Sequence, residues 1–442
     1  MNIKCNRLCI ILGIIQLLPG VTHAVSGALD TTFGNHGFTL TPLSRADALP
    51  SAIIQTALYE TDKIVVNGST QITAPSLLLA QYTSNGILDT GNFNRTGATP
   101  GYQVLLPSAL SPSATICAGN ALALDASSNI LVAGYAAQSP NTMLVARYTA
   151  AGFLDTTFNS GGALPGVVTQ SVGTGEGVTA NAIGVQSATH SNRIIVAGTS
   201  INNGTVGFTI AALNATSGAF DATFPNGSGP GYVITNAGNI STIKSMIIPS
   251  SGIYQDYIIV IGMVDNKIAI ARYTPTGALD TTFNGTGIFK PTISGASTSN
   301  AYAVAFDSSN NILIAGSAQI SGTNQSLLMR VTPVGTLDIT FNAPNGYVLQ
   351  PISYGSEFYS LAIQANNNIV AGGYAIGGLA NQISLARYTP TGAIDTLYGA
   401  SGVSLTTVGT LAAAQTVLIQ STQKAVTTGT ADGTICIARF LS

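Results

Sequence analysis

The sequence predicts an all-β protein, a single seven-bladed β-propeller of four-stranded antiparallel blades. A Gly-x-x-Asp element recurs seven times along the 442 residues, with its copies 57 to 66 residues apart. A fixed period of this length is typical of repeat architectures. Each period holds four short apolar segments, and the turns between them are too short for crossover helices, so the strands are antiparallel. Such units pack face to face around an axis.

The four segments of one period, here named A to D, are clearest in the fifth unit. They are Ala301–Asp307, Ile312–Gly316, Leu327–Thr332 and Gly346–Gln350. The B segments of other units are β-branched runs without polar alternation, as in Ile194–Gly198 (IIVAG). Runs of this kind are typical of strands that are buried on both faces.

Other all-β architectures fit the repeat less well. A two-sheet sandwich does not predict seven copies of one unit, and a β-solenoid needs a shorter repeat. An outer-membrane barrel needs alternating strands of about ten residues with one polar face, which the B segments lack. Repeat units bury their apolar faces against neighbours, so we expect one domain over residues 25–442.

The segment Ala271–Gly287 (ARYTPTGALDTTFNGTG), followed by an apolar D segment and a later Ile-[Leu/Ile/Val]-[Val/Ile]-Ala-Gly, resembles the delta-60 repeat of bacterial proteins. The resemblance extends from Gly27 to Phe440 and implies a propeller fold and secretion, but no activity. Two units depart from it, because Gln81 and Ala212 stand where the motif has Arg.

The repeated Asp is expected to cap the turn that follows it, with its oxygens accepting backbone N–H groups. In four units an Arg precedes it by eight residues, on the other side of a hairpin turn, so the two side chains can pair. The motif residues are Asp30, Asp89, Asp155, Asp221, Asp280, Asp338 and Asp395, with Arg147, Arg272, Arg330, Arg387 and Arg439.

After its first 24 residues, the chain begins with a D segment, and it ends with a C segment. This predicts how the ring closes. We expect Gly37–Leu40 to form the outer strand of the blade whose inner strands are the last residues. An open ring would leave two unpaired strand edges, which natural proteins avoid. Arg439 has no Asp after it and Asp30 has no Arg before it, so these two are predicted to pair across the closure.

The first 24 residues have a basic start, an apolar core and a small-residue end at Ala24, a pattern typical of a secretory signal peptide. The protein is therefore expected to be secreted, periplasmic or on the cell surface, as a monomer without stable membrane insertion. Charged residues are only 7% of the chain and the net charge is −2. Without clustered Lys and Arg, nucleic acid is not an expected partner.

Few residues suggest chemistry, and we expect no catalytic residue, metal or cofactor. Cys117 and Cys436 fall in different kinds of strand of non-adjacent units, which predicts two buried free thiols. His36 and His190 have no partner at metal-ligand or triad spacing, so both are predicted to be exposed turn residues. Tyr residues that follow the motif Arg or Gln are predicted to pack between blades; they are Tyr82, Tyr148, Tyr273 and Tyr388.

Two loops faintly resemble calcium loops, at residues 125–129 and 307–311. Both lack the additional carboxylates, the central Gly and the closing Glu of an EF-hand loop. Asp125 and Asp307 are therefore interpreted as the first residues of A–B turns, with Asx hydrogen bonding.

The A–B and C–D turns share one face of a propeller, and the B–C and D–A loops share the other. The second set is predicted to be longer and more varied, as in Ala133–Met143 and Thr169–Thr179. Varied loops on a rigid scaffold often carry recognition. The charged residues of this face are the candidate contact residues: Arg45, Asp47, Glu176, Asp265, Lys267 and Glu357.

Three functions remain open: a secreted binding module that recognises an extracellular protein or glycan through these loops, an extracellular hydrolase or lyase with its site at the channel mouth, and a structural envelope protein. A hydrolase needs two carboxylates within about 10 Å. Glu176 and Glu357 lie three units apart, so the sequence favours binding.

Overall fold

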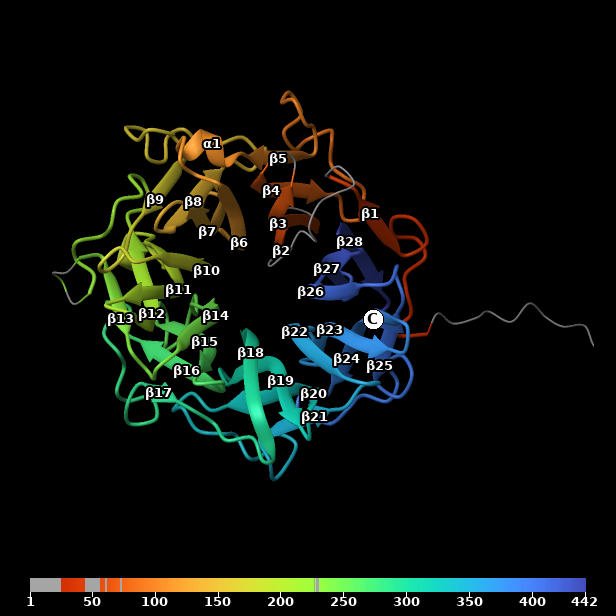
Figure 1. Cartoon of the computed structure of the whole chain (residues 1–442). Coiled ribbons are helices and arrows are strands. Elements are labelled where there is room, and N and C mark those ends of the chain that lie inside the picture. Colours follow the sequence, from red (N-terminus) through yellow and green to blue (C-terminus); the bar gives the residue numbers. More distant parts are fainter. Residues whose placement is uncertain (1–24, 44–55, 60–61, 72–73, 226, 228–229) are drawn as a thin grey trace, which may run out of the picture.

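The computed structural model describes residues 25–43, 56–59, 62–71, 74–225, 227 and 230–442. The predicted signal peptide therefore lies outside the described residues. The chain forms seven four-stranded antiparallel sheets arranged in a ring, which confirms the predicted seven-bladed propeller (Figure 1). The first strand of each blade faces the central channel and the last lies at the rim.

The blades are numbered in chain order. Blade 1 consists of β2 (Thr56–Tyr59), β3 (Lys63–Gln71), β4 (Pro75–Tyr82) and β5 (Tyr102–Leu105); blade 2 of β6 (Ile116–Leu124), β7 (Ile130–Ala137), β8 (Thr142–Tyr148) and β9 (Val167–Gln170). Blade 3 consists of β10 (Val178–Val185), β11 (Ile194–Asn202), β12 (Thr205–Leu213) and β13 (Tyr232–Thr235); blade 4 of β14 (Ser241–Ile247), β15 (Ile258–Val264), β16 (Lys267–Tyr273) and β17 (Ile288–Phe289).

Blade 5 consists of β18 (Ala296–Phe306), β19 (Ile312–Ile320), β20 (Thr323–Val331) and β21 (Tyr347–Gln350); blade 6 of β22 (Ser356–Ile363), β23 (Ile369–Gly377), β24 (Ala380–Tyr388) and β25 (Val403–Thr406). Blade 7 consists of β26 (Ala412–Ile419), β27 (Ala425–Ala431), β28 (Thr434–Phe440) and β1 (Phe38–Thr41). Short helices occur at α1 (Pro107–Leu110) and at the 3₁₀ turn Ala188–His190.

The hydrophobic core lies between neighbouring blades, in seven clusters that each join two sheets. In one of them Ile195 and Phe208 of blade 3 pack with Ile243 and Ile258 of blade 4. The motif tyrosines are fully buried in these clusters, as predicted: Tyr82, Tyr148, Tyr273 and Tyr388. Each blade is therefore stabilised by its neighbours, as the repeat predicted.

The two ends of the described chain close the ring. Strand β1 pairs antiparallel with β28, with Phe38 opposite Ala438. The outer strand is thus Phe38–Thr41, one residue later than the predicted segment. The Nε atom of Arg439 donates to Oδ2 of Asp30 over 2.8 Å, which confirms the predicted pair.

Four of the five motif Arg residues, all but Arg387, join their own turn to the next blade. Arg272 is only 1% exposed; its Nε donates to Oδ2 of Asp280 over 2.7 Å, and its Nη1 donates to the Pro333 carbonyl of blade 5. Its guanidinium lies 4.8 Å from the centre of the Phe283 ring. The same three contacts recur at Arg147, Arg330 and Arg439 with local partners.

The motif Gly is needed because an aromatic ring of the preceding blade covers it. Gly277 has a φ of +89°, and a Cβ atom there would lie 2.4 Å from Cζ of Phe224. Equivalent contacts join all seven blades: Gly86 with Phe33, Gly152 with Phe93, Gly218 with Phe158, Gly335 with Phe283, Gly392 with Phe341 and Gly27 with Tyr398. Only Gly tolerates both the backbone conformation and this close approach.

The two blades without a motif Arg supply the cation from another strand. In blade 1, Nζ of Lys63 lies 2.9 Å from Oδ2 of Asp89. In blade 3, Nε of Arg193 lies 2.5 Å from Oδ2 of Asp221. Both cations occupy the residue immediately before the apolar run of the B strand. A buried carboxylate needs a cationic partner. The position at the start of the B strand is therefore a second place from which a cation can pair with the motif Asp.

The loops differ from the prediction that variation is confined to one face. In five blades the B–C connection is a two-residue turn, and in four of these, such as Asn203-Gly204, both residues have positive φ. Such turns match the twist of a hairpin. The segment Ala133–Met143 is mostly strand, and the longest A–B connection, between Ile247 and Ile258, lies on the opposite face.

Stability is expected to fall at acid pH. Burial alone would raise the pKa of Asp280, but hydrogen bonds from Thr282 and the charge of Arg272 outweigh it and hold that pKa below its ordinary value. The pKa values of Asp155, Asp221 and Asp338 are lowered in the same way. A lowered folded-state pKa contributes stability above the unfolded value of about 4, and that contribution is lost as the pH falls further.

Urea unfolding measured between pH 8 and pH 2.5 tests this. The free energy of unfolding is expected to change little down to about pH 5 and to decline below about pH 4. In Asp280→Asn, the slope of the free energy of unfolding against pH below pH 4 should correspond to about one proton fewer taken up on unfolding. A free energy that rises below pH 4 would contradict the assignment.

Candidate binding site in the central channel

The inner strands share one irregularity, a β-bulge at the same level of the channel. The register shifts by one residue between Gly119 and Ala121 of β6, and at the matching place in β10, β14, β18, β22 and β26. A bulge re-aims the extra side chain. The extra residues, here named the bulge ring, are Asn120, Asn181, Lys244, Tyr302, Tyr359 and Gln415.

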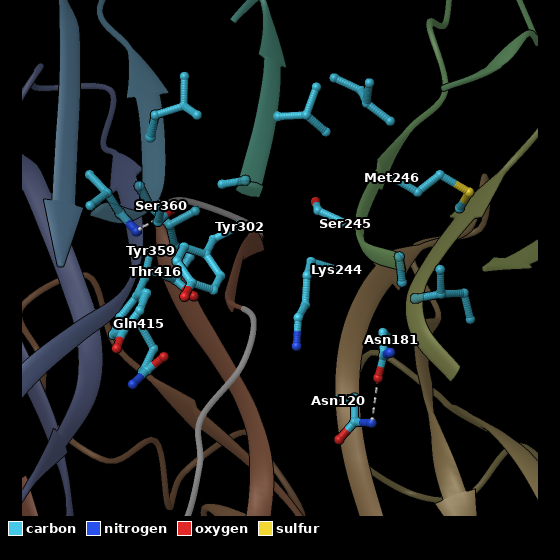
Figure 2. Close-up of a pocket in the computed structure, with 18 residues that line it drawn as sticks. Asn120, Asn181, Lys244, Ser245, Met246, Tyr302, Tyr359, Ser360, Gln415 and Thr416 are labelled. Carbon is cyan, nitrogen blue, oxygen red and sulfur yellow. Dashed lines mark hydrogen bonds between the residues drawn. The ribbon is translucent and has the colours of Figure 1, made fainter. Parts of the chain in front are cut away.

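The bulge ring lines a cavity of about 460 Å³ inside the channel. Figure 2 shows its side chains directed into this space from inner strands on opposite sides. The residue after each bulge is small, as at Ala182, Ser245 and Ala303, and the next is apolar, as at Ile183 and Val304. A polar belt therefore lies beside an apolar one.

Two residues of the bulge ring donate hydrogen bonds to the inner strand of the next blade. Nδ2 of Asn120 donates to the Ala180 carbonyl over 2.8 Å and to Oδ1 of Asn181 over 3.2 Å. Nδ2 of Asn181 then donates to the Ile243 carbonyl over 3.0 Å. These bonds cross from blade 2 to blade 3 and on to blade 4, so this arc of the ring is held in place before any ligand arrives.

Lys244 is the one charged side chain among the described residues that line the cavity. It is exposed to the channel, and within the described chain it has neither an ion pair nor a hydrogen bond from its ammonium group. Figure 2 shows the ammonium group extending into the cavity. It supplies a positive charge that no described neighbour neutralises.

Tyrosines and a buried carboxylate occupy the other side of the channel. The rings of Tyr302 and Tyr359 meet edge to face, with centroids 5.0 Å apart, and Tyr374 lies 5.5 Å from Tyr359. Behind them Glu357, 6% exposed, accepts a hydrogen bond from Nδ2 of Asn324. Burial and then the charge of Glu357 raise the pKa of Tyr302 and Tyr359, so both phenols stay protonated at neutral pH.

The candidate contact residues are not brought together. Glu176 accepts the Gly204 N–H, and Asp265 accepts the N–H groups of Asn239 and Ile240. Lys267 donates to the carbonyls of Ala296 and Ser297. These three order neighbouring loops, and Glu357 is buried.

Arg45 and Asp47 lie outside the described residues, and none of the other four candidates lines the cavity. The bulge ring was missed because its residues belong to A segments that were interpreted only as strands. The available signal was a large polar or aromatic residue between two small ones, as in Ala301-Tyr302-Ala303.

His190 was predicted to be an exposed turn residue, but it is partly buried and contacts an acid of the next blade. Its Nδ1 lies 2.8 Å from Oδ2 of Asp256, which lies in the A–B connection of the next blade, and Ser187 and Thr189 donate to the same carboxylate. Ser187 and His190 both contact the acid instead of each other, so this is a clamp between blades and not a nucleophile with its base. His36 is exposed as predicted, with its Nδ1 2.6 Å from Oδ1 of the adjacent Asn35.

The loops that faintly resembled calcium loops are Asx turns. Oδ1 of Asp125 accepts the N–H groups of Ser127 and Asn129, each over 2.9 Å, and Asp307 repeats the pattern. Among the residues that the structure describes, no three His, Cys, Asp or Glu side chains converge as metal ligands would.

Cys117 and Cys436 are buried free thiols, as predicted. Burial raises the pKa of each to about 12. Neither thiol is ionised at neutral pH, and the thiolate is the reactive form.

In the described part of the chain, no helix has both the length and the apolar character to cross a bilayer. No curated protein matches the sequence at a significant level. Among solved structures, Sqt1 of Chaetomium thermophilum bound to the N-terminus of ribosomal protein L10 is similar, with 11% identity over 91% of this chain and 100% of that one and a TM-score of 0.45.

Two further structures have a similar fold. One is an ulvan lyase of a polysaccharide lyase family, with 10% identity over 95% of this chain and 94% of that one and a TM-score of 0.43. The other is a protein from Lactobacillus plantarum, with 12% identity over 80% and 88% of the two chains and a TM-score of 0.45.

A model of β-propeller repeats, described as a domain of unknown function (DUF5122), matches residues 128–158, 191–224, 258–283, 308–341 and 364–398. Each match contains a B strand, a C strand and the motif turn. Together with the seven sheets, these matches identify the chain as a protein built from β-propeller repeats.

Proposed function

We propose that this protein is a secreted binding module, related to the delta-60 repeat proteins, that holds a small polar ligand in its central channel. The observation that supports this most directly is the bulge ring. Six blades direct a residue into one cavity from the same structural position, and the residue types are Asn, Lys, Tyr and Gln. The scaffold positions around them, by contrast, repeat from blade to blade.

A ring that served only packing would be filled by small or apolar side chains, as are the adjacent levels of the channel. Amides and phenols that converge on a cavity are suited to hydrogen bonding with a ligand. The volume of about 460 Å³ falls within the range of roughly 300–1,000 Å³ of small-molecule pockets. The loops of the B–C and D–A face then frame the mouth and do not form the contact site themselves.

Thermal unfolding of residues 25–442 in the presence of a panel of neutral and acidic mono- and disaccharides tests the proposal. At least one sugar is expected to raise the melting temperature in a concentration-dependent way. Tyr359→Ala and Gln415→Ala should weaken its binding at least tenfold, a loss of about 1.4 kcal/mol. Glu176→Ala, beside the Gly204 turn and outside the cavity, is the matched control and should bind as the parent chain does.

Circular dichroism of each variant distinguishes lost binding from lost structure. A panel without any bound sugar would contradict the proposal. Binding that is unchanged in both channel variants would also contradict it, because the contact site would then lie elsewhere.

A further inference from the structure

We propose that the ligand of this channel is a saccharide with one anionic group, a carboxylate or a sulfate ester, which Lys244 binds. This inference rests on the proposed function of the same site and adds the chemical class of the ligand. It starts from the position of one cation that has no partner among the residues that the structure describes.

Most described cationic side chains form ion pairs or hydrogen bonds within the protein. The motif Arg residues, Lys63, Arg193 and Lys424 form ion pairs, and Lys267 and Lys290 donate to backbone carbonyls. Among the described cations, only Arg95 and Lys244 lack such contacts. Arg95 is exposed in a C–D connection, whereas Lys244 extends into a cavity formed by the inner strands.

The cavity has no described acid that could neutralise this ammonium group. Glu357 is buried behind the tyrosines, where Asn324 and the hydroxyls of Tyr302 and Tyr374 are directed to it. A positive charge that no described acid offsets attracts an anionic group on a ligand. Lys244 therefore favours an anionic ligand over a neutral one of equal shape.

The rest of the ring indicates a polyhydroxylated body for the ligand. Gln415 offers both carbonyl and N–H groups, and Asn120, whose N–H groups are already bonded, offers its carbonyl oxygen. The phenol hydroxyls of Tyr302 and Tyr359 are directed to Glu357 and Tyr374, so their oxygens are left as acceptors. Next to them, Met246 and Val304 line the cavity and are partly exposed, so they form an apolar surface that suits the C–H face of a sugar ring. A single Lys fits one singly charged group, whereas phosphate-rich ligands are bound by clustered cations.

Calorimetric titration of residues 25–442 at low ionic strength distinguishes these features. The probes are glucuronate, glucose 6-sulfate, glucose, and sodium acetate as a bare anion. The two acidic sugars are expected to bind at least tenfold tighter than glucose, and to lose that advantage as salt is added. Whichever acidic sugar binds more tightly identifies the anionic group.

Lys244→Gln should remove the preference for acidic sugars, while Lys290→Gln, a change at the outer rim, should leave it intact. Equal binding of glucose and glucuronate, or a preference that survives Lys244→Gln, would overturn the inference. Acetate that bound as tightly as glucuronate would exclude the saccharide class.

The two proposals fail in different ways. Neutral sugars that bind through Tyr359 without any effect of Lys244→Gln would leave the proposed function standing and remove the anionic group. If no sugar bound the parent chain at all, both proposals would be wrong.

Discussion

A chain that starts at residue 42 is expected to lose its cooperative thermal unfolding transition and to aggregate. This truncation removes β1, the outer strand of blade 7, and exposes the edge of β28 over Ile435–Ala438. It also removes Asp30, so Arg439 would lose its ion pair while remaining largely buried. The third loss is Phe33, whose ring packs on Gly86 of blade 1.

These losses are expected to act together because the start of the chain pairs with blade 7, among the described residues, through β1 and the Leu29–Phe440 bridge, and the truncation removes both. Removing one partner of a buried ion pair costs about 3–5 kcal/mol on its own. That is comparable with the whole stability of many domains, about 5–15 kcal/mol. An exposed, unpaired strand edge then offers a template for association between chains.

A circular permutant is the matched control. The backbone N–H of Gly27 donates to the Leu441 carbonyl over 2.8 Å, so a short linker can join the described ends. New termini can be opened near Ile253, which lies in an exposed A–B connection of blade 4. The permutant keeps β1 and is expected to melt cooperatively. A truncated chain that melted like the parent would show that the closure contributes little.

The sequence predicted the parts of the fold that repeat along the chain. The Arg–Asp pairs and the strand order follow from spacings within one hairpin, and the pairing of Asp30 with Arg439 follows from the two ends of the same pattern. Such local, periodic relations can be recognised in a single sequence because a motif residue that is replaced in one copy is present in most of the other six.

The features that were not predicted depend on contacts between blades, on a cation placed at a different position of the repeat, or on a local change of strand register. His190 meets Asp256 because two A–B connections of adjacent blades touch, and no spacing encodes that contact. Lys63 replaces the missing Arg from a different strand. The bulge ring was not predicted, because a bulge changes the direction of a side chain without changing the apolar pattern around it.

Arg272→Met is expected to lower the free energy of unfolding by about 3–5 kcal/mol, because it leaves the Asp280 carboxylate buried without a counter-charge. The Arg272 side chain is 1% exposed and packs against Tyr254 and Phe283 as well as the acid. Met retains part of that packing, so most of the loss is electrostatic. Urea unfolding at pH 7 measures it.

The double variant Arg272→Met, Asp280→Asn separates the charge from the packing. Asn keeps an oxygen that can accept the Thr282 N–H, which Oδ1 of Asp280 accepts over 3.0 Å, but carries no charge. The double variant should therefore be more stable than Arg272→Met alone, by about 1–3 kcal/mol. Arg95→Met, at an exposed site, is the control and should change stability by less than about 0.5 kcal/mol.

Acid pH provides an independent check on the same cycle. The folded-state pKa of Asp280 is lowered in the parent chain, so the pair contributes stability above about pH 4 and loses it as the acid protonates. The difference between the parent chain and Arg272→Met should then shrink as the pH falls below 4. If the double variant were no more stable than the single one, or the difference persisted in acid, packing and not charge would hold the motif together. The substitution of Lys63 and Arg193 for the missing motif Arg argues against that result, because both cations come from a different strand and still place a positive charge beside the motif Asp.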